Sequence, residues 1–181
     1  MKISFQIDKI KASMEMDKKD PFQRITKLLE EQGELFESYF QNCDLIDSIE
    51  EAIDNLLVTI SIAYVIDKDS LQHMENLFNL SIKDYKKSLV ETEMINLAIS
   101  SGRIADSVQK YLKVGASIYK GSMSKDDTLL DIEKSILIIS KILNGLLEDM
   151  DFDKVSYINS IIDKKNSKWL EKSIIGQKQK I

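Results

Sequence analysis

The chain of 181 residues has one proline, six glycines, one cysteine and one histidine. So little proline and glycine argues against a sheet with many tight turns, and abundant Leu, Ile, Lys, Glu, Asp and Ser supports long helices. The single cysteine excludes an internal disulfide and a cysteine-based zinc site, which indicates a reducing compartment. We therefore predict an all-α protein that resides in the cytoplasm.

Two further absences bear on the partners. No apolar run reaches the roughly 20 residues that a membrane span needs, and the N-terminus MKISFQIDKI alternates charged with apolar residues instead of forming a signal-peptide core. The 25 basic and 30 acidic residues give a formal charge of -5 and are mixed along the chain without a basic block. The sequence thus predicts neither a membrane nor a nucleic-acid partner.

Hydrophobic periodicity predicts a helical bundle of about eight helices. The first covers about residues 3–15, and Asp20 followed by Pro21 is a typical helix start, so the second covers about 21–41. A third helix is expected to begin near Asp47 or Ser48. Its second half, LLVTISIAYVI, is apolar almost all round, which places it at the centre of the bundle.

The second half of the chain repeats this plan faintly. Aligning Gly33 with Gly102 and Asp54 with Leu137 keeps the apolar positions in register and suggests an internal duplication. Under this alignment, the acidic positions of the first copy are replaced in the second. We predict two four-helix halves in tandem, residues 1–90 with an intact acidic motif and residues 91–181 without it, packed together as a pseudo-dimer.

The segment LLEEQGELFESY and the following helix carry the most unusual charges. Glu31 and Glu34 lie three residues apart on one helix face, and Glu51 and Asp54 do the same on the next helix. A short turn makes these helices antiparallel neighbours, so the four carboxylates could converge. Their mutual repulsion would then require a divalent cation, and oxygen ligands of this kind suit Mg²⁺ or Mn²⁺.

The alternative interpretation is a solvated helix face, because acidic pairs at this spacing are expected by chance in so acidic a chain. Two details favour the metal site. Gly33 inside a helix costs about 1 kcal/mol relative to alanine, which suggests close packing or ligand approach. Asp54 lies two residues before an apolar run that begins at Leu56, which places it at the edge of the core.

The motifs EEQGEL and EAIDNLL, in this order and with sixteen residues between Glu34 and Glu51, resemble the EExxE and ExxD signature of the MazG-like all-α nucleoside triphosphate pyrophosphohydrolases, the group that includes the dimeric dUTPases. The resemblance covers residues 22–66. It implies that Glu31, Glu34, Glu51 and Asp54 bind Mg²⁺. It also implies a catalytic role for Glu30 as a supporting or base residue and for Glu31, with cleavage of a nucleotide between its α and β phosphates.

The same resemblance implies basic residues that contact the phosphates of a nucleotide. The family's last helix carries an asparagine followed by lysines, and NSIIDKKNSK resembles that pattern more closely than NLSIKDYKK. The residues implied are Lys83 and Lys87 in the first half and Asn159, Lys164 and Lys168 in the second. A fused pseudo-dimer would draw its metal ligands from one half and its phosphate ligands from the other, and a homodimer would allow similar sharing.

His73 is expected to lie on a helix surface, and one histidine cannot supply the paired Glu-x-x-His motifs of a di-iron bundle. Trp169 could stack on a base, although packing of its helix is the preferred interpretation. The predicted function is Mg²⁺-dependent hydrolysis of an NTP or dNTP to the monophosphate and pyrophosphate. The alternative is a non-catalytic helical module that binds a protein partner and uses its acidic pairs only for solubility.

Overall fold

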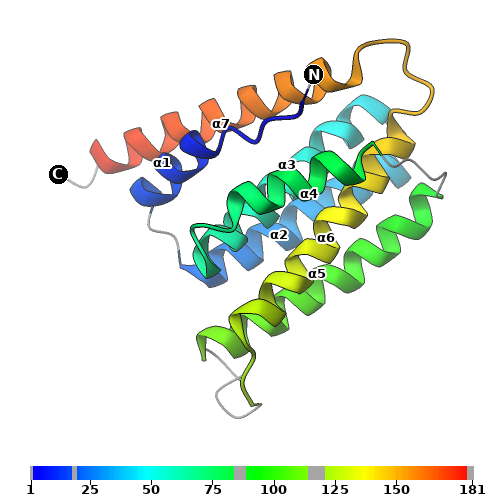
Figure 1. Cartoon of the computed structure of the whole chain (residues 1–181). Helices are drawn as coiled ribbons and strands as arrows, with labels where there is room; N and C mark the ends of the chain where they lie inside the picture. The colour runs from blue at the N-terminus through cyan, green and yellow to red at the C-terminus, as the bar shows by residue number, and fades with distance from the viewer. Residues whose placement is uncertain (1, 18–19, 84–88, 114–120, 179–181) are drawn as a thin grey trace.

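The computed structural model describes residues 2–17, 20–83, 89–113 and 121–178, and these residues form seven α-helices and no strand, which confirms the all-α prediction (Figure 1). About eight helices were expected. The helices are α1 (Ile7–Asp17), α2 (Pro21–Phe36), α3 (Leu45–Ile66), α4 (Leu71–Ser81), α5 (Val90–Leu112), α6 (Lys125–Leu146) and α7 (Lys154–Lys178), and a π-helical segment, η1 (Glu37–Gln41), continues α2.

The hairpin of α2 and α3 begins as its sequence indicates. The side chain of Asp20 accepts a backbone hydrogen bond at 3.0 Å, and α2 with η1 fills the predicted range 21–41. The third helix begins earlier than expected, at Leu45. The reason is that Asp44, not Asp47, is its N-cap: Asp44 Oδ1 accepts from the backbone N–H of Asp47 at 3.0 Å.

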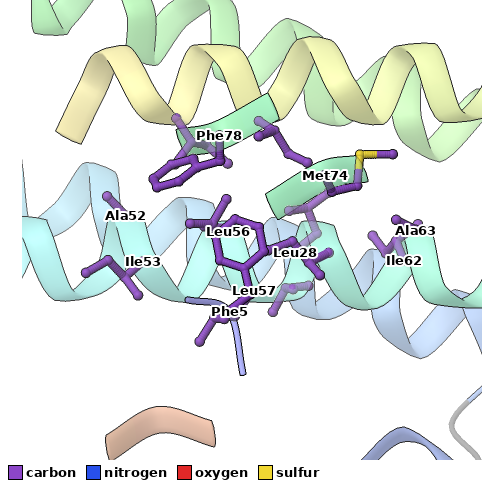
Figure 2. Packing of buried hydrophobic residues seen from close by; sticks show 14 of the residues in the cluster. Phe5, Leu28, Ala52, Ile53, Leu56, Leu57, Ile62, Ala63, Met74 and Phe78 are labelled. Carbon is purple, nitrogen blue, oxygen red and sulfur yellow. The ribbon is translucent and has the colours of Figure 1, made fainter. Parts of the chain in front are cut away.

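Helix α3 is the centre of the core, as its apolar second half predicts. It packs against α2 and α6 and also contacts α4 and α7. Figure 2 shows its side chains meeting Leu28 of α2, Met74 and Phe78 of α4, and Phe5 from the N-terminal segment. Burial along almost the whole of α3 fixes the position of the polar residues near its start, including the carboxylates considered below.

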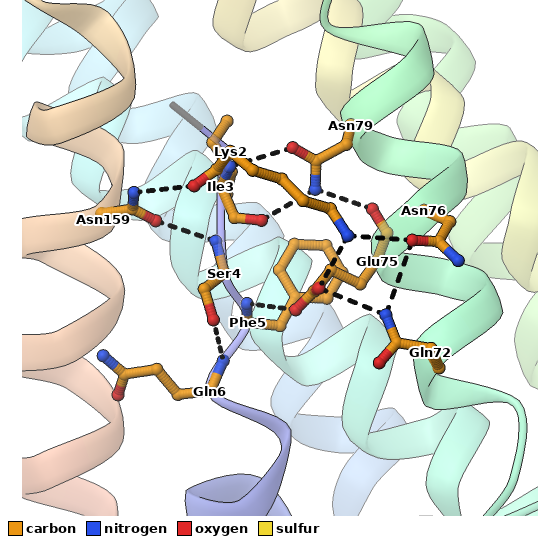
Figure 3. Close-up of polar contacts among 10 residues, drawn as sticks. All are labelled: Lys2, Ile3, Ser4, Phe5, Gln6, Gln72, Glu75, Asn76, Asn79 and Asn159. Atoms are coloured by element: carbon orange, nitrogen blue, oxygen red, sulfur yellow. Dashed lines mark hydrogen bonds and ion pairs between the residues drawn. The ribbon is translucent and has the colours of Figure 1, made fainter.

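The N-terminal segment corrects the sequence interpretation, because residues 2–6 are not helical and α1 starts only at Ile7. Ile3 and Phe5, two residues apart, both point into the core and are fully buried. The backbone between them is held by side chains. Asn79 binds the N–H and C=O of Ile3 at 2.9 and 2.8 Å, and Glu75 accepts from the N–H of Phe5 at 2.8 Å (Figure 3).

The segment 89–113 and 121–178 supplies α5, α6 and α7. Helices α5 and α6 form a hairpin, and α6 packs on α3, so residues from both predicted halves share one hydrophobic core. Helix α7 instead lies beside α1 and α3 (Figure 1). The division into two MazG-like halves stays a prediction. None of the helices in the described part of the chain has the length and apolar character to cross a membrane.

Candidate metal centre

Three of the four predicted metal ligands come together. One carboxylate oxygen each from Glu31 of α2 and from Glu51 and Asp54 of α3 lie within 4.8 Å of one another, the single group of this kind found among the described residues. Glu31 and Asp54 are buried, with 4% and 7% of their surface exposed, and Glu51 is half-buried. The short α2–α3 connection and the three-residue spacing on α3 produce this convergence.

The fourth predicted ligand, Glu34, lies one turn along α2 from Glu31 and is exposed. Partial burial and then the charge of Glu31 raise its pKa. Glu30 is also exposed and forms an ion pair with Lys27 at 2.8 Å. We define the carboxylate cluster as Glu31, Glu51 and Asp54. Glu34 borders this cluster, whereas Glu30 is paired with Lys27.

Two lysines reach the cluster, and the sequence interpretation missed both of them. Lys27 of α2 pairs with Glu31, and Lys165 of α7 pairs with Asp54 and lies 3.7 Å from an oxygen of Glu50. A signal for Lys165 was present in the helical periodicity. It follows the buried residues Ile161 and Ile162 by four and three positions and so shares their inward face.

The two lysines do not satisfy the cluster. Glu31 Oε2 and Glu51 Oε2 are buried and have no hydrogen-bond donor among the described residues. Burial and then Asp54 raise the pKa of Glu51 to about 8. Burial also raises the pKa of Asp54, although Lys165 opposes that shift. Orphaned buried carboxylate oxygens that repel each other are the donor set that a hard divalent cation would satisfy.

The pKa of Glu51 makes stability depend on pH. At a pH between 4.5, the ordinary pKa of a glutamate, and about 8, Glu51 is ionised in the unfolded chain but still protonated in the folded protein. The free energy of unfolding of the metal-free protein is therefore expected to fall as the pH rises from 5 to 8. Urea denaturation in EDTA measures this slope, and Glu51→Gln should flatten it. An equal slope in the wild type and the variant would contradict the assignment.

The predicted phosphate ligands are scattered. Lys164 is exposed on α7 and lies 3.4 Å from Glu50, close to the cluster, and Lys168 is exposed one turn further on. The side chain of Asn159 is already engaged, since it accepts from the N–H of Ser4 at 2.9 Å and donates to the carbonyl of Lys2 at 3.2 Å (Figure 3).

The first-half lysines do not add to this group. Lys83 is exposed just beyond α4 and lines a hollow of about 180 Å³ with Ile3, Asn79 and Lys154. Lys87 lies outside the described residues. Of the predicted phosphate ligands, Lys164 is thus the one that an ion pair places next to the acidic residues of α3, beside the unpredicted Lys165.

Gly33 is not required by packing, which corrects one of the two explanations offered for it. A Cβ atom added there would meet nothing within 4 Å, and the same holds for Gly102 on α5. Approach of a ligand at Gly33 stays a prediction.

Gly33→Ala is expected to raise the free energy of unfolding by about 1 kcal/mol, because alanine has the higher helix propensity and no neighbour obstructs it. Gly102→Ala is the matched control in α5 and should stabilise the protein equally. Urea denaturation of both variants provides the measurement. Destabilisation by Gly33→Ala alone would show that the helix is constrained at this position.

The predicted second copy lacks the carboxylate cluster at the positions aligned from the sequence. Ser100, aligned with Glu31, is buried, and Lys134, aligned with Glu51, pairs with Asp131 at 3.1 Å. Arg103 is exposed and Leu137 lines a hollow between α4 and α6. These neutral or basic side chains give the α5–α6 hairpin no comparable set of carboxylates among the described residues.

The other candidates behave as surface and packing residues. His73 is exposed on α4, as expected, and its Nε2 lies 3.0 Å from Glu133 of α6. Trp169 is partly buried against the hydrophobic core, in agreement with the packing interpretation. Comparison of the chain with protein-family models, with curated proteins and with solved structures finds no significant match.

Proposed function

We propose that this protein is a Mg²⁺-dependent nucleoside triphosphate pyrophosphohydrolase that cleaves an NTP or dNTP to the monophosphate and pyrophosphate. The observation that carries the proposal is the convergence of Glu31, Glu51 and Asp54 from two helices, with two buried oxygens left without donors. The motif resemblance on the same residues supplies the substrate class. Mn²⁺ would serve in place of Mg²⁺, because both prefer oxygen ligands.

The cluster would hold the cation through the carboxylates of Glu31, Glu51 and Asp54. When bound, a divalent cation neutralises charge on phosphate oxygens and lowers the pKa of a coordinated water. Glu34 is exposed beside Glu31, and its raised pKa suits a general base that takes the proton from the attacking water. We favour Glu34 over Glu30 for this step because Glu30 is paired with Lys27.

Lys164 would contact the phosphates. It lies on the exposed edge of the cluster beside Glu50, and its side chain is 66% exposed, so it can reach a ligand that approaches from solvent. An ammonium group at this place favours a polyanionic substrate. Gly33, with open space beside it on α2, presents no side chain that would obstruct such a ligand.

The test is incubation of the protein with a panel of NTPs and dNTPs and Mg²⁺, with pyrophosphate scored separately from orthophosphate. Release of pyrophosphate from at least one nucleotide, lost on addition of EDTA, is the expected result. Glu34→Gln should lower turnover by about a hundredfold or more without changing helicity. Release of orthophosphate in place of pyrophosphate would contradict cleavage between the α and β phosphates.

A second function is favoured by the lysines themselves. Lys27 and Lys165 already pair with two of the three carboxylates, as in a structural ion-pair network. The protein would then be a non-catalytic helical module that binds a protein partner. No product from any nucleotide, together with no effect of Mg²⁺ on thermal stability, would favour this function over the first.

A further inference from the structure

Helix α7 contacts the N-terminal segment and α1 on one side and α3 on the other. On one side, Asn166 donates to the carbonyl of Phe5 at 2.9 Å and Asp163 accepts from Lys9 at 2.6 Å, so the N-terminal segment and α1 hold the helix. On the other side, Lys164 and Lys165 approach α3. Because these contacts flank Lys165 within two residues, the backbone that carries its side chain is fixed over the carboxylate cluster.

This arrangement places the ammonium group of Lys165 next to the carboxylate cluster. Its side chain is 15% exposed and contacts Asp54, whose own side chain is 10% exposed. A second carboxylate, that of Glu50, lies 3.7 Å away from the same nitrogen and is 27% exposed. The lysine therefore has an inner partner inside the cluster and an outer partner nearer to solvent.

We propose that Lys165 is an internal counter-ion that competes with a divalent cation for Asp54, so that metal binding requires its ammonium group to move outward to Glu50. The inference rests on the proposed function, because it takes Asp54 to be a metal ligand. It adds a regulation that the resemblance does not imply: the affinity for metal is set by a residue of α7, outside the α2–α3 hairpin.

The physical reasons are charge and space. A divalent ion coordinated by Asp54 would share that carboxylate with an ammonium group in direct contact, and two cations so close together in a partly buried site repel strongly. The four-carbon stem of lysine is flexible, and so the ammonium group can exchange partners while the helix stays in place. Glu50 keeps the displaced charge paired, which lowers the free energy needed for the exchange.

The test is a titration of the metal-free protein with Mn²⁺, in which electron paramagnetic resonance measures the concentration of unbound Mn²⁺. Displacement of bound Mn²⁺ by added Mg²⁺ then gives the affinity for Mg²⁺. Lys165→Met is expected to tighten binding of Mn²⁺ at least about tenfold, because the competing charge is gone. Lys172→Met is the matched control. It removes the same charge from an exposed residue of the same helix, two turns further on, and should change the affinity by less than about twofold, since exposed charges are screened.

Lys165→Arg is a second variant, used in case Lys165→Met does not fold. Arginine keeps the positive charge next to Asp54. Its guanidinium can bind a carboxylate through two hydrogen bonds, so Mn²⁺ should bind more weakly than to the wild type. Equal Mn²⁺ affinity in the wild type, Lys165→Met and Lys165→Arg would contradict the proposal that Lys165 competes with the metal ion, but not the metal site itself. Absence of Mn²⁺ binding in all three proteins would overturn the metal site and the proposed function together.

Discussion

Replacing Asp54 by asparagine is expected to weaken Mg²⁺ binding by at least a hundredfold and to abolish release of pyrophosphate. Asp54 contributes one of three clustered carboxylates and is 7% exposed, so no solvent-facing group can replace it. Loss of a residue that only supports a metal ligand already costs roughly 10–100-fold, and loss of a ligand itself costs more. Calorimetric titration with Mg²⁺ and the nucleotide assay provide the two measurements.

Glu93→Gln is the control for Asp54→Asn. Glu93 of α5 is also buried and also pairs with a lysine, Lys141, at 3.2 Å, but it has no place in the carboxylate cluster. This variant should retain metal binding and turnover. Unchanged Mg²⁺ affinity in Asp54→Asn, or equal losses in the two variants, would show that the cluster does not bind the ion.

Phe5→Ala is expected to reduce the free energy of unfolding by about 3–5 kcal/mol, the typical loss when a buried phenylalanine leaves a cavity. Phe5 is fully buried and its ring lies 5.4 Å from that of Phe78, centroid to centroid. The same residue also anchors the N-terminal segment that binds Asn166 of α7. Urea denaturation followed by circular dichroism measures the change.

Phe40→Ala is the matched aromatic control, because Phe40 is 52% exposed on η1. Because its ring is half exposed, its loss should change the free energy of unfolding by much less than the loss of Phe5, on the order of 0.5 kcal/mol. A similar effect of the two substitutions would mean that the N-terminal segment does not pack into the core as the structure shows.

Local signals in the sequence predicted much of the helical hairpin. Asp20 and Pro21 mark the start of α2 because capping and a preset φ act within a few residues. The spacing of Glu51 and Asp54 predicted a shared helix face, and the short connection to α2 predicted that Glu31 would lie nearby. All of these inferences depend on neighbours in sequence or across one turn.

The N-terminal segment and Lys165 depend instead on contacts between distant parts of the chain. The roughly helical spacing of Phe5, Ile10 and Met14 favoured a helix over the whole segment. The side chains that hold the backbone of Ile3 and Phe5, those of Asn79 and Glu75, lie 76 and 70 residues away. Likewise, Lys165 reaches Asp54 across 111 positions. Helical periodicity indicates that Lys165 lies on the inward face of α7, but no local pattern identifies Asp54 as its partner. The family resemblance instead implied the adjacent Lys164 as a phosphate ligand.

The most direct test of the central claim is a crystal structure of the wild-type protein grown with Mn²⁺, with anomalous scattering used to locate the ion. The expected result is one anomalous peak at roughly 2.0–2.3 Å from oxygens of Glu31, Glu51 and Asp54, with the ammonium group of Lys165 moved away from Asp54. A fully occupied peak elsewhere, or an empty cluster in which Lys165 still contacts Asp54 at saturating Mn²⁺, would contradict it.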